Sequence, residues 1–242
     1  MTQRTEPPFR ADHVGSLLRP QKLLDARAAH AAGDIDRFAL RAIEDDAIRD
    51  VVRMQEDIGL QSATDGEFRR TSWHMDFIYQ LQGVHRTDEQ IAVHFRNAQG
   101  DLDFTSAALK IDGKIGLDEA IFGADFEFLK SVVTTATPKL TIPSPSMVHY
   151  RGGPAAIDKS VYPDEDEFWS DLSAAYAKQV QQIAALGCRY LQLDDTSLAY
   201  LNDPEQRAEL AAKGGDAEHQ HERYIRQINA ALADRPADLR VT

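Results

Sequence analysis

The feature that most constrains the fold of this chain is a short stretch, Arg189–Asp195, that ends in two carboxylates. Alternation along it places the two leucines on one face of an extended chain and Tyr190, Gln192 and Asp194 on the other. The helical pattern before it ends at Gly187. A carboxylate at the C-terminal end of a strand between helices is typical of the active-site edge of α/β barrels and open α/β sheets. The stretch therefore predicts a strand whose polar face borders a site.

The same unit occurs earlier in the chain. Apolar residues recur with a period near 3.6 between positions 36 and 58, and this helical pattern ends at Gly59. A short strand over residues 61–65 follows and ends in Asp65. Helix, glycine, strand and acid thus occur twice, and repeated βα units build barrels and doubly wound sheets. The repeat indicates an α/β protein.

The other expected elements extend this alternation. They are strands over residues 9–17, 139–146 and 239–242, and helices that start at Pro20 or cover 71–81, 125–135, 168–186 and 217–233. Five strands, the last of them cut short, fall below the eight of a closed barrel. We therefore expect one incomplete domain over residues 1–242, corresponding to roughly the first half of a TIM (β/α)8 barrel, with an open sheet as the alternative.

One segment, between residues 84 and 115, breaks the helix–strand rhythm. Apolar and polar residues alternate over 91–96, and both 97–100 and 112–113 carry turn signals. We expect a β-hairpin here, inserted into a βα loop, where it is suited to covering a site.

Composition excludes several classes of protein. The net charge of −12 argues against non-specific binding to nucleic acid, which needs a basic surface. No apolar run approaches the length of a membrane span, and the first ten residues lack the apolar core of a signal peptide. The single cysteine, Cys188, cannot form an internal disulfide and fits a reducing compartment. We expect a cytoplasmic protein.

Two acidic residues are the main candidates for chemistry. Glu67 and Asp194 both follow strand ends, where they can bind a substrate ammonium group, act as acid and base, ligate a metal, or cap the next helix. Asp195 is better explained as a helix cap or a supporting residue. Arg69 and Arg70 either pair with Glu67 at the surface, which is the more common outcome, or hold an anionic substrate.

Other residues have both a chemical and a structural explanation. His13, at the end of the first expected strand, is a weak candidate for a ligand or proton carrier, since a lone histidine is more often structural. His219 and His221 resemble a metal pair, but residues two apart on a helix do not face each other, so we expect them in solvent. Cys188 is expected in the core, and Trp73 partly in the core with one face on the pocket.

Five motifs occur in order along nearly the whole chain: His13–Pro20, Thr64–Arg70, Ser72–Trp73, Ile142–Ser146 and Leu191–Asp195. Together they resemble the catalytic domain of cobalamin-independent methionine synthase, in its short, single-domain relatives. The resemblance implies a zinc-dependent TIM-barrel methyltransferase of methionine biosynthesis, similar to 5-methyltetrahydropteroyltriglutamate–homocysteine S-methyltransferase. Such an enzyme moves a methyl or alkyl group from a methyl-folate-type donor to a homocysteine-type thiol, which zinc holds as the reactive thiolate.

The resemblance also implies roles for individual residues. Val14 and Ser16 would contact the amino-acid portion of the thiol substrate. Glu67 and Asp194 would bind its ammonium group, and Trp73 would lie near the other substrate. The partners are therefore a small-molecule thiol and a methyl donor, with no nucleic acid and no membrane.

The chain departs from the family pattern at two points. Asp195-Thr196 stands where methionine synthases usually have Glu-Pro, which leaves the acceptor open, because coenzyme M alkyltransferases have similar front motifs. The family's zinc ligands, a His-x-Cys followed by a Glu and a Cys, would by position begin after Thr242. We therefore expect no metal site in this chain, and zinc ligands supplied by a C-terminal half, as a continuation or a second chain. The expected protein partner is such a half, or another copy of this chain by self-association.

Three functions remain open at this stage. The first is the front half of a zinc-dependent thiol methyl- or alkyltransferase. The second is a non-catalytic, truncated-barrel binding module that keeps the acid pair. The third is a zinc-free barrel lyase or decarboxylase that uses His13 and Asp194 as acid and base.

Overall fold

The structure, a computed structural model, describes residues 4–97, 100–150 and 152–242. Its elements in chain order are α1 (Gln21–Ala32), α2 (Arg37–Asp57), β1 (Ser62–Ala63), α3 (Met75–Ile78), β2 (Gln82–Asn97), β3 (Gly100–Gly116), α4 (Gly123–Val132), β4 (Thr137–Pro143), α5 (Ser146–Tyr150), the 3-10 helix η1 (Gly153–Ala156), α6 (Glu165–Ala185), β5 (Tyr190–Asp194), α7 (Ser197–Tyr200), α8 (Pro204–Ala212), α9 (Gln220–Leu232) and β6 (Arg240–Val241).

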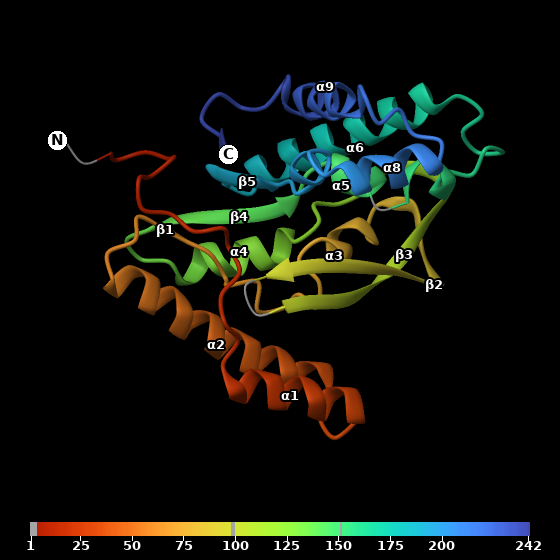
Figure 1. The fold of residues 1–242 in the computed structure, drawn as a ribbon. Helices are drawn as coiled ribbons and strands as arrows, with labels where there is room; N and C mark the ends of the chain where they lie inside the picture. Colours follow the sequence, from red (N-terminus) through yellow and green to blue (C-terminus); the bar gives the residue numbers. More distant parts are fainter. Residues whose placement is uncertain (1–3, 98–99, 151) are drawn as a thin grey trace.

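A parallel sheet with the strand order β1-β4-β5-β6 lies at the centre of the molecule (Figure 1). In the view of Figure 1, α6 and α9 lie above this sheet, and α1 and α2 lie below it. Parallel strands joined by helices confirm the predicted α/β class. The described strands do not close into a barrel, so the half-barrel stays a prediction.

The predicted strand over residues 9–17 is wrong, because this segment joins no ladder of the sheet. It crosses the polar face of the sheet instead, and we call residues 9–19 the N-terminal strap. The buried Lys139 ammonium group donates to the His13 carbonyl oxygen at 2.6 Å, and Gln192 donates to that of Val14 at 2.6 Å. Side chains of β4 and β5 thus donate to strap carbonyl oxygens, which would bond a neighbouring strand if the strap were part of the sheet.

The helix α6 carries the main core of the molecule. Its stripe of Leu172, Tyr176, Val180 and Ile183 is buried, as the 3.6-residue period predicts. Cys188 is fully buried in the same core, which confirms its predicted structural position. Burial raises the pKa of this thiol to about 11, so it is held as the inert, protonated form.

The hairpin predicted near residues 84–115 is confirmed, since β2 and β3 pair in an antiparallel ladder. Its predicted turn includes residues 98 and 99, which lie outside the described residues. The base of the hairpin packs into the main core, where Val84 and Ile111 are buried. No described side chain of the hairpin lines the pocket that holds the predicted site residues.

Local hydrogen bonds explain where the helices depart from the predictions. The predicted helix over 71–81 shrinks to the single turn of α3, because the Asp76 carboxylate accepts the backbone N–H groups of Thr71 and Ser72. The unpredicted α8 starts where Asp203 accepts the N–H of Glu205 at 2.8 Å. Short helices without a long apolar period leave little signal in a sequence.

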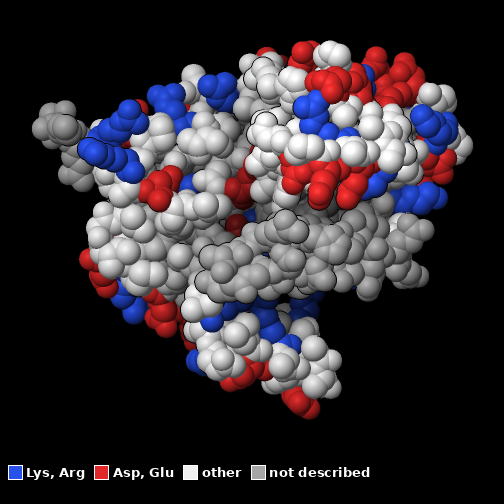
Figure 2. Space-filling model, in the orientation of Figure 1, with Lys and Arg blue, Asp and Glu red and all other residues white. Residues whose placement is uncertain are grey.

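The charge of the molecule is unevenly distributed. Figure 2 shows acidic side chains gathered over the region formed by α6, α8 and α9.

No helix in the described part of the chain is long and apolar enough to cross a membrane.

Candidate functional site

A pocket of about 500 Å³ opens at the carboxyl end of β5. All five residues that the sequence assigns to substrate binding line this one pocket, although they come from four separate parts of the chain. The strap, the loop after β1, the segment before α3 and β5 each contribute. The lining consists of Val14, Ser16, Glu67, Trp73, Gln192, Leu193, Asp194, Asp195, Thr196 and Thr242.

The loop after β1 holds Glu67 in an unusual backbone conformation. Gly66 and Glu67 both have positive φ angles, 67° and 59°, and the left-handed region is costly for a residue with a side chain. The Asp65 carboxylate accepts the Glu67 N–H at 2.9 Å. Arg19 of the strap donates to the Glu67 carbonyl oxygen at 2.9 Å and to that of Arg70 at 2.8 Å. These bonds hold the loop in the strained form that turns Glu67 toward the pocket.

The Glu67 side chain is only 2% exposed and has two partners. The Thr141 hydroxyl donates to Glu67 Oε1 at 2.8 Å, and Arg70 Nη1 lies 3.5 Å from the same oxygen. Arg70 also donates to the Thr141 carbonyl oxygen at 2.7 Å, and its guanidinium lies over the Phe122 ring. One sequence alternative placed the Glu67–Arg70 pair at the surface. The structure has this pair, but it is buried.

The neighbouring Arg69 faces away from this pocket. Its side chain is 5% exposed and pairs with Glu44, Asp45 and Asp125. Neither Arg69 nor Arg70 lines the pocket of Glu67 and Asp194. The alternative in which these two arginines hold an anionic substrate in that pocket finds no support in the geometry.

Asp194 ends β5 and lines the same pocket as Glu67. Burial and the nearby negative charge of Glu67 raise the pKa of Asp194 to about 6, against a hydrogen bond from Gln192 and the positive charge of Arg70, which lower it. Gln192 also donates to the Val14 carbonyl oxygen, so the same side chain joins Asp194 to the strap. A carboxylate whose ionisation is disfavoured by burial and by a second carboxylate forms a site suited to a cation.

The strap reaches the pocket because it contains a glycine. Gly15 has a φ of 140°, and a Cβ atom there would lie 2.5 Å from Thr141 Cγ2 and 3.3 Å from Glu67 Oε1. The Thr64 hydroxyl fixes this approach by donating to the Gly15 carbonyl oxygen at 2.6 Å. Val14 and Ser16 are thereby exposed at the pocket rim.

Asp195 has the capping role that the sequence predicts. Its Oδ1 accepts the backbone N–H of Ser197 at 2.7 Å and that of Leu198 at 3.3 Å, at the start of α7. Its Oδ2 accepts hydroxyl groups of Ser144 and Ser146. Both oxygens are thus already bonded within the chain, although the residue borders the pocket.

Trp73 lines the pocket and is partly buried, as predicted, with its ring 4.4 Å from that of His74. His219 and His221 are exposed, and His219 pairs with Asp216, which agrees with the expectation of solvated histidines.

His13 belongs to the strap but does not line the pocket. Gln55 Oε1 accepts the N–H of Thr64 at 3.0 Å, and Gln55 Nε2 donates to the Val51 and Thr64 carbonyl oxygens. His13 Nε2, 2.8 Å from Gln55 Oε1, must therefore carry a proton and donate. This geometry gives His13 a structural bond and does not bring it together with Asp194 in one pocket.

The zinc ion that the resemblance implies does not fit the described residues. They contain no group of three or more His, Cys, Asp or Glu side chains arranged to hold a metal ion. Around the pocket, the Asp195 oxygens are occupied and Cys188 is buried elsewhere in the core. We therefore derive no chemical step through a metal in this chain.

Thr141 and Lys139 are the residues at the site that sequence reasoning missed. Both belong to β4 and lie two apart, so alternation places them on the same face of the sheet. A lysine and a threonine inside a strand that is otherwise apolar were a usable signal for a polar interior.

Comparison with known proteins gives relatives along almost the whole chain. The uncharacterized protein YxjH of Bacillus subtilis is 41% identical over 99% of this chain and 63% of its own length. A methionine synthase of Sulfolobus acidocaldarius is 25% identical over 76% of this chain and 51% of its own length. No protein-family model matches the chain.

Solved structures give the same result. A crystal structure from Listeria monocytogenes, of a candidate vitamin-B12 independent methionine synthase, is 39% identical, with a TM-score of 0.78 over 98% of this chain and 64% of the other. A B12-independent methionine synthase from Shewanella sp. W3-18-1, in complex with selenomethionine, shares the fold at 18% identity, with a TM-score of 0.62 over 91% of this chain and 57% of its own.

The chain spans less than two thirds of the length of YxjH and of the Listeria protein. The relatives and structural neighbours of this chain are cobalamin-independent methionine synthase-like proteins, which confirms the resemblance carried by the five sequence motifs.

Proposed function

We propose that this chain provides the amino-acid-binding part of a methionine-synthase-like enzyme that transfers a methyl group from a methyl-folate-type donor to a homocysteine-type thiol. The observation that carries the proposal is the acid pair of Glu67 and Asp194 at one pocket. The names of the relatives support the reaction class.

The electrostatics of the pocket favour a ligand with an ammonium group. An ammonium group carries one positive charge and three N–H donors, so it can bond both carboxylates at once. Its charge offsets the repulsion that raises the pKa of Asp194. Leu193 and Trp73 supply an apolar wall for the aliphatic chain of the same ligand, and Ser16 supplies a hydroxyl at the rim.

The chain's own residues bind and orient the acceptor in this proposal. Methyl transfer to sulfur also needs the acceptor as a thiolate, which a zinc ion favours when bound. Because the described residues do not fit that ion, we propose from the family pattern that its ligands lie outside the described residues, on a continuation or a second chain. The full reaction then requires both parts.

Calorimetric titration of the 242-residue chain tests the binding part of this proposal. L-homocysteine and L-methionine are compared with 4-mercaptobutanoate and 4-(methylsulfanyl)butanoate, which lack only the amino group. We expect the amino acids to bind at least 30-fold more tightly, because the deaminated ligands bring no ammonium group to the two carboxylates. Glu67→Gln should remove most of this preference, whereas Glu209→Gln on the exposed face of α8 should keep it. Equal affinity for both ligand types in the wild-type chain would contradict the proposal.

A further inference from the structure

Thr141 contacts two of the sequence motifs at the site, His13–Pro20 through Gly15 and Thr64–Arg70 through Glu67 and Arg70. It lies in the middle of β4, is 2% exposed, and its hydroxyl oxygen is 2.8 Å from Glu67 Oε1 and 3.3 Å from Arg70 Nη1. Its methyl group faces Gly15 so closely that no side chain fits at that glycine. It does not line the pocket, so it meets the ligand only through Glu67.

The direction of the hydrogen bonds at Thr141 is set by its neighbours. A hydroxyl has one proton, and a guanidinium can only donate. Thr141 Oγ1 therefore accepts from Arg70 and has its proton free for Glu67 Oε1. An ionised carboxylate can only accept, so this order satisfies all three groups. The Glu67 oxygen that bonds Thr141 is thus held at a defined point above β4.

The strand supplies a rigidity that the Glu67 loop lacks by itself. Glu67 lies in a loop at a left-handed φ, whereas Thr141 belongs to a strand paired on both sides, with β1 and β5. Arg70 ties the loop to that strand through the Thr141 carbonyl oxygen. A group that must recognise an ammonium needs a fixed position, because a loosely held carboxylate loses part of its binding energy in ordering.

We propose that Thr141 is a positioning residue for Glu67 and that its hydroxyl sets the preference of the pocket for ligands with a free amino group. This inference rests on the proposed function. It assigns to Thr141 a role in ligand selection beyond packing, since a purely structural threonine would affect amino and deaminated ligands alike.

The test is an isosteric substitution, Thr141→Val, which removes the hydroxyl and keeps the shape. Titration with L-methionine and with 4-(methylsulfanyl)butanoate should show about a 10-fold loss of affinity for the amino acid and less than a 2-fold change for the deaminated ligand. Thr141→Ser keeps the hydroxyl and should restore the preference. Thr87→Val, on β2, is the matched control, because it removes a buried hydroxyl that has no hydrogen-bond partner.

A double-mutant cycle separates Thr141 from the rest of the pocket. In a Glu67→Gln background, Thr141→Val should weaken L-methionine binding by less than 2-fold, since its charged partner is already gone. Thr141→Ala gives a second hydroxyl-free variant if the valine variant is poorly folded.

The outcomes distinguish this inference from the proposed function. If the wild-type chain shows no preference for the amino acid, the proposed function fails, whatever Thr141 does. If the wild-type preference is present and Thr141→Val keeps it, or weakens both ligands equally, the positioning role is overturned and the proposed function stands.

Discussion

Two carboxylates near opposite ends of the sheet, Asp194 and Glu56, have pKa values shifted in opposite directions. Asp194 lies at the carboxyl end of β5, where burial and Glu67 raise its pKa to about 6. Glu56 lies in the last turn of α2, next to the loop that enters β4. Although partial burial raises its pKa, hydrogen bonds from Ala136, Thr135 and Thr134 outweigh this and lower it to about 2.

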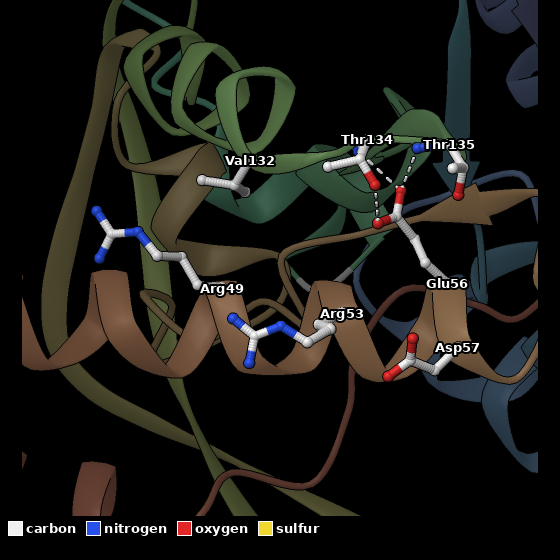
Figure 3. Close-up of a pocket in the computed structure, with 7 residues that line it drawn as sticks. All are labelled: Arg49, Arg53, Glu56, Asp57, Val132, Thr134 and Thr135. Carbon is white, nitrogen blue, oxygen red and sulfur yellow. Dashed lines mark hydrogen bonds between the residues drawn. The ribbon is translucent and has the colours of Figure 1, made fainter.

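The Glu56 carboxylate accepts the N–H groups of Thr134 at 2.8 Å and Thr135 at 2.6 Å and the Thr134 hydroxyl at 2.7 Å (Figure 3). It also accepts the N–H group of Ala136 at 2.9 Å. It thereby fastens the loop between α4 and β4 to the end of α2. A carboxylate with this many donors is a structural clasp.

The pockets beside these two acids have the same volume, about 500 Å³ each. Around Glu56, the guanidinium groups of Arg49 and Arg53 point away from the clasp and pair with Asp46 and Asp50 of the same helix. Charge is balanced there without a ligand. At Asp194 the charges of two acids oppose each other. Pocket size therefore does not distinguish the two places, whereas the raised pKa of Asp194 does.

The largest expected difference between the two acids is in ligand binding. Asp194→Asn should weaken binding of L-methionine about 100-fold, because one of the two charges that face the ammonium group is lost. Glu56→Gln should change it less than 2-fold. Calorimetric titration of both variants measures this. A similar loss in both would show that the acid at the carboxyl end has no special role.

The next largest effect is on the free energy of unfolding, and here the substitution of Glu56 has the larger effect. Glu56→Ala should lower the free energy of unfolding by about 2 kcal/mol, because the donors of the exposed Thr134 and Thr135 and of the half-buried Ala136 lose a charged acceptor. Asp57→Ala, at the exposed neighbour, should stay within about 0.5 kcal/mol of wild type. Urea denaturation gives both values. Equal stability of the two variants would show that the Glu56 carboxylate does not stabilise the loop between α4 and β4.

A smaller effect of opposite sign is expected for Asp194 in the absence of ligand. Asp194→Asn should raise the free energy of unfolding, since it removes a partly desolvated charge that is repelled by Glu67. The gain should be only about 1 kcal/mol, because the remaining hydration of Asp194 weakens this repulsion. This corresponds to roughly 3 °C in the melting temperature. A loss of stability in this variant would mean that Asp194 has a structural partner that outweighs the repulsion.

The smallest effects are the pH dependences of stability, and their signs differ. The folded pKa of Asp194 lies above its ordinary value of 3.8, so its contribution to stability is present at low pH and is lost as pH rises through about 6. The folded pKa of Glu56 lies below 4.5, so its contribution is present above pH 4.5 and is lost as pH falls toward 2. Urea denaturation between pH 3 and 7 measures the free energy of unfolding against pH. The fall in stability toward pH 6 should be smaller in Asp194→Asn, and the loss of stability at low pH should be smaller in Glu56→Gln.

The elements predicted from the sequence are those with a strong period or a clear stop signal. α2 and α6 follow their apolar stripes, and Gly59 and Gly187 have the positive φ angles of a helix end. β5 follows its alternation, and the hairpin follows its turn signals. The strap and the helix predicted over residues 71–81 are exceptions. For the strap, a pattern of extended residues does not say whether the chain joins a ladder or crosses its face.

The sequence by itself determined which residues meet at the site, since the motifs that carry the family resemblance contain Val14, Ser16, Glu67, Trp73 and Asp194. Only the tertiary structure decided how they are held. The left-handed turn at Glu67, its bond to Thr141 and the close approach of Gly15 depend on atoms up to 126 residues apart. Local sequence specifies periods and turns, whereas a buried charge takes its pKa and its position from whatever the fold places beside it.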